Sequence, residues 1–267
     1  MKTIGLIGGM GWESSKLYYE RINKKVNKIL GGSHSAKIIM ISVDFEEIKK
    51  LTFANDWEAI SVIVVKNAKQ LEKAGADMVV LCTNLIHIVS DEIIRAINIP
   101  FIHIASASAD AVHKKRLKRI LFLGTKYIME KDFYINTFKE KGLEVVIPNK
   151  EDRNTIHNII YEELLKGVFS NKSKQQILKI IHKNELVEGV VLACTELPML
   201  IRKKDVSIPC FDTGNIHVDK VVKTALGIEN MEYIDIKNIQ KGISFEKHNL
   251  SEEKIEKEWK KLKNKIL

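Results

Sequence analysis

Two of the three cysteines lie in similar short sequence motifs, called the cysteine or Cys-Thr phrases below, at distant points of the chain. The sequence reads MVVLCTNLIH around Cys82 and GVVLACTELP around Cys194, whereas Cys210 stands between Pro209 and Phe211. Each phrase is an apolar, largely β-branched run that ends in Cys-Thr and a polar residue. A cysteine at a strand end is usually a small hydrophobic core residue, and that is our interpretation of Cys210. The repetition favours chemistry at the other two.

Two thiols on opposite sides of a small molecule could move a proton on and off one carbon atom. A thiolate would remove the α-proton of an amino acid from one face, and the opposing thiol would deliver a proton to the other face. Near-symmetry suits this reaction because the two roles exchange when it runs in reverse. A helix N-terminus lowers the pKa of a thiol below its ordinary value of about 8.5, so we expect a thiolate at one cysteine. This chemistry requires no cofactor and no metal.

The negative charge that builds up on such a substrate needs hydrogen-bond donors around it. Each cysteine is followed by a threonine and a polar residue, CTN in one phrase and CTE in the other. The glycine turns IGGMG and LGT allow close approach of the backbone, and Thr125 adds a hydroxyl donor. These features fit a binding site beside each cysteine.

The segments that must position the cysteines alternate between strand-like and helix-like patterns. Continuous apolar runs at residues 3–9, 36–45 and 76–83 predict strands, and amphipathic stretches at 12–30 and 57–75 predict helices. The pattern then starts again, with strands predicted at 118–125, 143–148 and 188–196 and a helix at 154–169. Continuous apolar strands joined by helices are typical of parallel sheets covered on both faces.

This repetition predicts an internal duplication, with two similar α/β lobes. The phrase INIPFIHI at 97–104 is echoed by VSIPCFDT at 206–213 as a further strand of each half. We predict that lobe 1 comprises residues 1–104 plus about 211–230, and lobe 2 residues 105–210. Residues 231–267 form a C-terminal extension that is expected to end in an amphipathic helix. Ligands bind at the carboxyl ends of parallel strands, so both cysteines should face a cleft between the lobes.

Composition excludes several other classes. The chain has 267 residues, of which 45% are hydrophobic and 29% charged, and its 43 basic and 34 acidic residues give a net charge of +9. The lysines are mixed with acidic residues and form no aromatic-basic strip, so we expect no nucleic-acid partner. No apolar run reaches the roughly 20 residues of a membrane span, and the N-terminus lacks the features of a signal peptide. With too few cysteines for a disulfide framework, we expect a cytoplasmic protein without a membrane partner.

Several segments carry a resemblance to a known family. They read GLIGGMGWESSKLYY, HSAKIIMISVDFEEI, GADMVVLCTNLIH, LGTKYIMEKDFY, YEELLKG, GVVLACTELP and FDTGNIH, and they lie in this order within about residues 1–228. The chain resembles the cofactor-independent aspartate/glutamate racemase family, and within it the bacterial branch of broad specificity most of all.

The resemblance implies two flavodoxin-like (Rossmann-like) lobes related by pseudo-twofold symmetry, with the active site in the cleft between them. It also implies a small amino-acid substrate, interconversion of the L and D forms, no cofactor and commonly a homodimer. Cys82 and Cys194 would be the two catalytic bases. The residues implied for substrate binding are Met10, Thr83, Asn84, Thr125, Thr195 and Glu196.

One departure from the family pattern concerns the substrate. Aspartate-specific members hold the side-chain carboxylate with an Arg early in the chain and a Lys in the helix near YEE. Here the early region reads SVDFEEIKKL without Arg, and Leu165 takes the place of the lysine with Lys166 one position later. A neutral or broader amino-acid substrate is therefore open beside aspartate and glutamate.

Other interpretations fit less well. The glycines follow the order Gly5-x-x-Gly8-Gly9-x-Gly11 rather than the G-x-G-x-x-G of dinucleotide sites. A zinc site would need more ligands than two distant cysteines supply. Trp12 could line the cleft, although packing in the core or against another subunit is the simpler interpretation. The alternatives for function are a non-catalytic protein that binds small amino acids and another isomerase of the same superfamily.

One histidine follows the first cysteine phrase closely. His87 lies one turn after Cys82 and could tune its thiol, but a structural hydrogen bond fits this histidine equally well.

Overall fold

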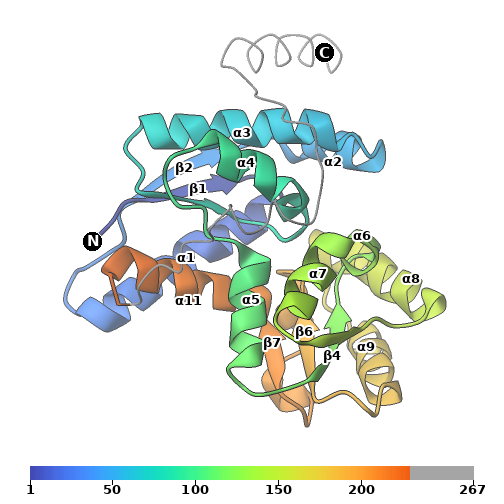
Figure 1. Cartoon of the computed structure of the whole chain (residues 1–267). Coiled ribbons are helices and arrows are strands. Elements are labelled where there is room, and N and C mark those ends of the chain that lie inside the picture. The colour runs from blue at the N-terminus through green and yellow to red at the C-terminus, as the bar shows by residue number, and fades with distance from the viewer. Residues whose placement is uncertain (229–267) are drawn as a thin grey trace.

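The computed structural model describes residues 1–228, which fold into two α/β units around two separate parallel sheets (Figure 1). The predicted extension at 231–267 and its helix lie outside the described residues. Among the residues described, no helix is both long and apolar enough to span a membrane.

The first sheet has three parallel strands in the order β2-β1-β3, with bounds β1 (Ile4–Gly8), β2 (Ile38–Ser42) and β3 (Met78–Leu81). The strand predicted at 97–104 is reduced to a single parallel bridge between Phe101 and Val79. It stops early because the next helix begins at Ile104, where the His103 ring accepts a hydrogen bond from the Ala105 backbone N–H.

The second sheet repeats this order with a complete fourth strand. Its order is β5-β4-β6-β7, all parallel, with bounds β4 (Arg119–Leu123), β5 (Glu144–Val146), β6 (Gly189–Leu192) and β7 (Cys210–Asp212). In both sheets the first strand of the unit is central, and the strand that leads to a cysteine phrase lies beside it. The prediction of an α/β fold with two parallel sheets is confirmed.

Helices cover both sheets, and one helix from the end of the described chain returns to the first sheet (Figure 1). In the first half the helices are α1 (Trp12–Leu30), α2 (Phe45–Phe53), α3 (Trp57–Lys73), the 3-10 helix η1 (Leu85–Val89), α4 (Ser90–Ala96) and α5 (Ile104–His113). In the second half they are α6 (Lys126–Glu130), α7 (Asp132–Glu140), α8 (Lys150–Asn158), the π-helical turn η2 (Ile159–Glu163), η3 (Leu164–Lys166), α9 (Asn171–Lys183), α10 (Leu197–Leu200), η4 (Lys203–Asp205) and α11 (Thr213–Leu226).

The pleat of the first sheet sorts its side chains onto two faces. Val79 and Leu81 of β3 pack in a core with residues of α2 and α3. Met78 and Val80 pack on the opposite face with residues of α1 and α11, and Cys82, one residue past the strand, lies in that same core. The helix α11 therefore completes the core of the first unit. The division of the chain into lobes at residues 104 and 210 stays a prediction.

The helix predicted at 154–169 is broken into α8, η2 and η3. The π turn η2 begins directly after α8. The 3-10 helix η3 then ends at Gly167, whose φ of +74° lies in the left-handed region that favours glycine. This irregular region presents Ile160, Tyr161 and Leu165 toward the first unit, where they help to line a cavity.

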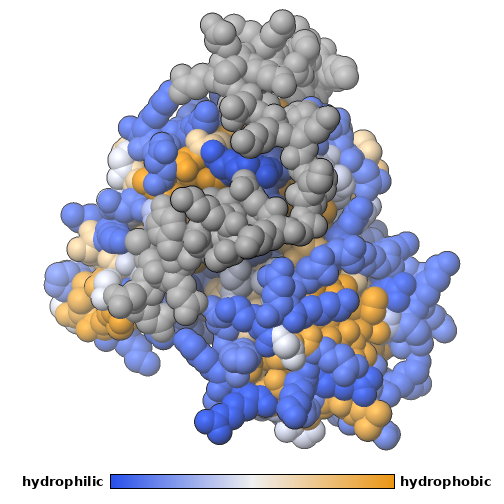
Figure 2. All heavy atoms as spheres, in the orientation of Figure 1, coloured by the Kyte–Doolittle hydropathy of each residue, from blue (hydrophilic) through white to orange (hydrophobic). Residues whose placement is uncertain are grey.

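On the face shown in Figure 2, hydrophilic residues cover much of the coloured surface and hydrophobic areas lie between them. The first residue of α1, Trp12, is 63% exposed and does not line the cavity described below.

Candidate active site

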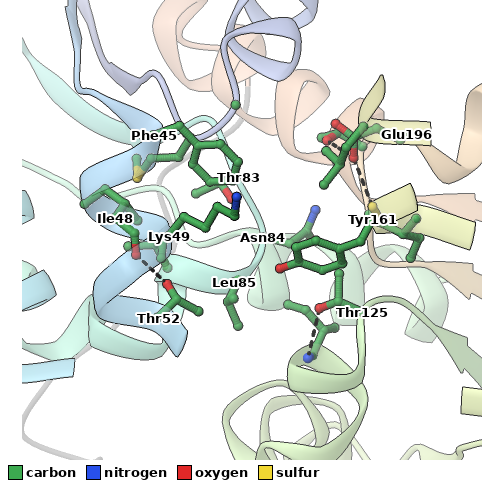
Figure 3. A pocket seen from close by; sticks show the side chains of 18 of the residues that line it. Phe45, Ile48, Lys49, Thr52, Thr83, Asn84, Leu85, Thr125, Tyr161 and Glu196 are labelled. Carbon is green, nitrogen blue, oxygen red and sulfur yellow. Dashed lines mark hydrogen bonds between the residues drawn. The ribbon is translucent and has the colours of Figure 1, made fainter. Parts of the chain in front are cut away.

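A cavity of about 690 Å³, including its solvent-open mouth, lies where the two units meet (Figure 3). Its walls come from the loops after β1, β3, β4 and β6, from α2, and from the irregular turn after α8. Carboxyl ends of parallel strands are the usual place for ligands in open α/β sheets. The predicted site residues that line it are Met10, Thr83, Asn84, Thr125, Cys194, Thr195 and Glu196.

Cys194 lies on the wall of the cavity that comes from the second unit. Its side chain is nearly buried, at 7% exposure, and its Sγ donates a hydrogen bond to Glu196 Oε2 over 2.9 Å. The same carboxylate oxygen accepts a hydrogen bond from the Thr195 hydroxyl at 2.8 Å. Burial raises the pKa of the Cys194 thiol well above its ordinary value, and the neighbouring Glu196 carboxylate raises it further. Because it accepts this hydrogen bond, the Glu196 carboxylate could also take the thiol proton.

Cys82 lies in different surroundings. It has no exposed surface, packs in the core beside α1 and α11, and is not among the residues that line the cavity. Its neighbours Thr83 and Asn84 do line the cavity, so the cavity wall begins one residue beyond the cysteine. The Ser14 hydroxyl of α1 donates a hydrogen bond of 2.7 Å to the Cys82 carbonyl and holds this strand end against the helix.

The expectation that a helix N-terminus lowers the thiol pKa is wrong for both cysteines. Burial raises the pKa of Cys82 far above the ordinary value, as it does for Cys194. At Cys82 burial is the cause. At Cys194 hydrogen bonds from the backbone N–H groups of Glu196 and Leu197, at the start of α10, do lower the pKa, but burial and the Glu196 carboxylate outweigh them.

Hydrogen-bond donors face the cavity from both units. Thr125 accepts a hydrogen bond from the Ile128 backbone N–H at the start of α6, which leaves its own hydroxyl hydrogen to donate elsewhere. The Asn84 side-chain nitrogen is buried without a protein partner. Together with Thr83 these groups could hold a carboxylate.

Sequence reasoning missed the cationic group and much of the apolar wall. The Lys49 side chain lines the cavity from α2 and is labelled on the first-unit side in Figure 3. Its Nζ lies 3.6 Å from Glu46, and the side chain is 41% exposed. The lysine follows Ile48 in the segment that lacks the family's arginine. Only the orientation of α2 about its axis, which decides which side chains face the cavity, could have identified it. The apolar residues of the wall are Phe45, Ile48, Phe53, Leu85, Ile86, Ile128, Ile160, Tyr161 and Leu165.

Lys166, considered above as a substitute for the missing lysine, points elsewhere. Its Nζ lies 2.6 Å from the exposed Glu162 carboxylate, and Lys166 does not line the cavity. Leu165 does line it, so this part of the wall is apolar.

His87 belongs to a cluster of three histidines behind the first cysteine phrase, in which His87 and His217 are buried and His103 is partly buried. Its ring centroid lies 4.9 Å from that of His103 and 5.6 Å from that of His217. His217 Nε2 lies 2.7 Å from the Ile102 carbonyl, so it carries the proton, and its Nδ1 accepts from the Tyr18 hydroxyl at 2.8 Å. Among the described residues, no three His, Cys, Asp or Glu side chains are grouped to hold a metal ion. His87 does not line the cavity.

Comparison with known proteins agrees with this geometry. The family model for Asp/Glu/Hydantoin racemase matches residues 7–221. The chain belongs to this family. The Broad specificity amino-acid racemase RacX of Bacillus subtilis (strain 168) is 22% identical in an alignment that covers 85% of this chain and all of that protein.

Two solved structures of the racemase family are more similar in sequence. A candidate Asp/Glu racemase from Yersinia pestis is 43% identical, with a TM-score of 0.81, and an aspartate racemase homologue from Pyrococcus horikoshii OT3 is 39% identical, with a TM-score of 0.75. Each alignment covers 85% of this chain and the whole of the other. The two-sheet architecture of the racemase family is therefore that of this chain.

Proposed function

We propose that this protein is a cofactor-independent amino-acid racemase in which Cys194 and Cys82 exchange the α-proton of the substrate between its two faces. Membership of the racemase family supports an amino-acid racemase. The observation that carries the mechanism is the cavity itself, because the Cys-Thr phrases from both sheets contribute to its walls through Thr83, Asn84, Cys194 and Thr195.

The chemistry starts at the second cysteine phrase. The Cys194 thiol passes its proton to Glu196, which already accepts its hydrogen bond, and the thiolate then takes the hydrogen from the substrate α-carbon. The electron pair of that C–H bond moves into the α-carboxylate, where Asn84 and the threonine hydroxyls stabilise the charge. Delivery of the Cys82 thiol proton to the opposite face completes the inversion, and the reverse reaction exchanges the two roles.

The raised pKa of Cys82 suits the proton-donating role, because a buried thiol keeps its proton at neutral pH. The mechanism requires this thiol to reach the space that its neighbours Thr83 and Asn84 line. The burial of Cys82 is also the observation that favours a second candidate, a protein that binds a small amino acid in the same cavity without racemising it, or an isomerase that uses one cysteine.

For the substrate, we propose an amino acid whose side chain extends toward α2. From α2 this wall has the apolar Phe45, Ile48 and Phe53, and Thr52, whose hydroxyl donates to the Ile48 carbonyl of the same helix. Its charged group is Lys49, which can pair with a side-chain carboxylate at the mouth of the cavity. Aspartate and glutamate fit this arrangement, and the apolar surroundings accept neutral side chains as well. A homodimer and a cytoplasmic location stay predictions of the sequence.

The test is incubation with single enantiomers in heavy water without any added cofactor. Racemisation followed by chiral chromatography, with deuterium at the α-carbon by NMR, is the expected result for L-aspartate, L-glutamate or a neutral amino acid of the panel. Saturable binding without exchange would instead support the binding protein and contradict the racemase.

A further inference from the structure

The amide of Asn84 is held between the two units at the back of the cavity. Asn84 follows β3 in the first unit, and it is 6% exposed. Its Oδ1 accepts a hydrogen bond from the hydroxyl of Tyr134 in α7 at 2.6 Å. The Thr213 hydroxyl at the start of α11 lies 3.0 Å from the same oxygen and 3.1 Å from the Leu192 carbonyl, and its one hydrogen can be donated to either. Tyr134 and Thr213 are both distant from Asn84 in sequence, and Tyr134 belongs to the core of the second unit.

The hydrogen bond from the Tyr134 hydroxyl to Oδ1 orients the Asn84 amide. A separation of 2.6 Å is usual for O–H···O hydrogen bonds and short for N–H···O. The oxygen of the amide is therefore the end that meets the tyrosine, and the NH2 group takes the other side. The Nδ2 atom is buried and has no partner in the protein, and Figure 3 shows it directed into the space between Lys49 and Tyr161.

An amide in this orientation selects the chemistry of its ligand. The NH2 group offers two donors and no acceptor, so it matches a carboxylate oxygen and repels an ammonium group. A buried donor without a partner destabilises the protein until a ligand accepts its hydrogen bonds. Reversal of the amide would present the oxygen instead and would favour the ammonium.

The tyrosine is itself held rigidly. Its ring centroid lies 5.0 Å from that of Phe122, 5.2 Å from that of Phe133 and 6.1 Å from that of Phe138. Burial raises the pKa of the Tyr134 hydroxyl above its ordinary value, so the group remains a donor at neutral pH.

We propose that Tyr134 is a positioning residue that locks the Asn84 amide from the opposite unit, so that its NH2 group binds the α-carboxylate of the substrate. This inference rests on the proposed racemase for the identity of the ligand. The selection of a carboxylate then depends on contact between the two units, because the amide of Asn84 comes from the first unit and the hydroxyl that orients it comes from the second.

The test compares Tyr134→Phe, which removes one oxygen and keeps the ring, with Thr137→Val. Thr137 also lies in α7, but its hydroxyl donates to the Phe133 carbonyl of the same helix. Calorimetric titration uses three probes: L-glutamate, glutarate, which lacks the ammonium, and 4-aminobutyrate, which lacks the α-carboxylate. Tyr134→Phe should bind L-glutamate and glutarate about threefold to tenfold more weakly and 4-aminobutyrate as the wild type does. Thr137→Val should match the wild type for all three.

A spectroscopic measurement adds a readout that a purely structural role would not move. The side-chain NH2 signals of Asn84, identified as those missing from Asn84→Asp, should shift when glutarate binds to the 15N-labelled wild-type protein. In Tyr134→Phe the same titration should give a smaller shift at equal occupancy.

Four results would overturn the inference. They are unchanged glutarate binding by Tyr134→Phe, equal weakening of all three probes, selective loss of 4-aminobutyrate, and failure of the wild type to bind glutarate at millimolar concentration. Failure of the racemase proposal is separate. A wild-type protein that exchanges no α-proton but shows the probe-selective loss in Tyr134→Phe would refute the reaction and keep the positioning role.

Discussion

The two Cys-Thr phrases end equivalent strands of their sheets and yet place their thiols in different surroundings. Cys82 is fully buried on the face of the first sheet that α1 and α11 cover. Cys194 faces the cavity, and its thiol donates a hydrogen bond to the carboxylate of Glu196. The backbone positions differ by one residue: Cys82 directly follows Leu81 of β3, whereas Cys194 lies two residues after Leu192 of β6, and Ala193 takes the position that Cys82 has in the first unit. One thiol therefore has a proton acceptor and the other lies in an apolar core.

The residue two positions after each cysteine adds a second difference. Glu196 folds back onto its own cysteine, whereas the equivalent Asn84 reaches away to Tyr134 in the other unit. The two units thus share the strand ends, and they differ in the extra residue Ala193 before Cys194 and in the third residue of each phrase. We expect the two cysteines to respond differently to substitution of their neighbours while both remain essential for inversion.

The largest effect should come from the cysteines. Cys194→Ala and Cys82→Ala should each lower the rate of racemisation by about 10²- to 10⁴-fold, the range for loss of a positioned acid or base. Chiral chromatography of the product measures this rate, and Cys210→Ala, which alters a cysteine outside the cavity, is the control. A near-normal rate for Cys82→Ala would show that the two-base mechanism is wrong and that Cys194 acts with another donor.

The second effect concerns the carboxylate that only one phrase possesses. Glu196→Gln should lower kcat by about 10²-fold, because the amide cannot accept the proton of Cys194. The pKa of the Cys194 thiol should nevertheless fall, since burial remains but the negative charge that also raises it is gone.

Alkylation by iodoacetamide across a pH series measures that pKa when it is carried out in the Cys82→Ala, Cys210→Ala background. The exposed Glu162→Gln is the matched control for loss of one carboxylate. A Cys194 pKa that stays constant or rises in Glu196→Gln would contradict the electrostatic interpretation of this phrase.

The contrast between the cysteines marks how far sequence could predict the site. The repeated phrase was enough to predict the two sheets, because apolar runs and turn residues are local features. It also predicted the residues that line the cavity near each strand end. It could not predict that Cys82 lies behind the wall, since the pleat and the arrival of α11 from the other end of the chain decide which core holds it. Lys49 was missed for a related reason, because the orientation of α2 about its axis determines which of its side chains reach the cavity.

A smaller effect should come from the charged side chain of Lys49 on the first-unit wall of the cavity. Lys49→Ala should raise KM for L-aspartate and L-glutamate by about twofold to fivefold, a modest change because the side chain is 41% exposed and screened by solvent. KM for neutral amino acids should stay the same, and added salt should narrow the difference. Lys50→Ala removes an exposed charge from the same helix as a control. Equal changes in KM for acidic and neutral substrates would show that Lys49 does not contact the side chain.

The last effect is on stability rather than on the reaction, and it concerns the cluster of three histidines in the first unit. Burial is the main cause that lowers the pKa of each, to about 3 for His103, to about 4 for His217, and well below the ordinary value for His87. These histidines stay neutral in the folded protein, while the unfolded chain binds protons below pH of about 6.5. Stability is therefore fully present above that value and falls as the pH drops toward the folded pKa values.

His87→Phe tests this pH dependence with the least damage to the hydrogen bonds. The His87 ring lies beside the backbone of Thr83 and Asn84, but neither of its nitrogens reaches hydrogen-bonding geometry. Phenylalanine keeps the ring contact with Phe101, whose centroid lies 5.4 Å away, and removes the titration. Between pH 7.5 and 5.5 the wild type should lose about 1.4 kcal/mol more unfolding free energy than the variant, as measured by urea unfolding.

The exposed His182→Gln of α9 is the control and should follow the wild type across the same pH range. Its side chain lies in solvent and outside the cluster, so any change there would report loss of a histidine in general. Parallel curves for the wild type and His87→Phe would mean that His87 gains its proton without unfolding. The loop of Thr83 and Asn84 beside it would then carry a positive charge in acid, and ligand binding in the cavity should change with pH even though stability does not.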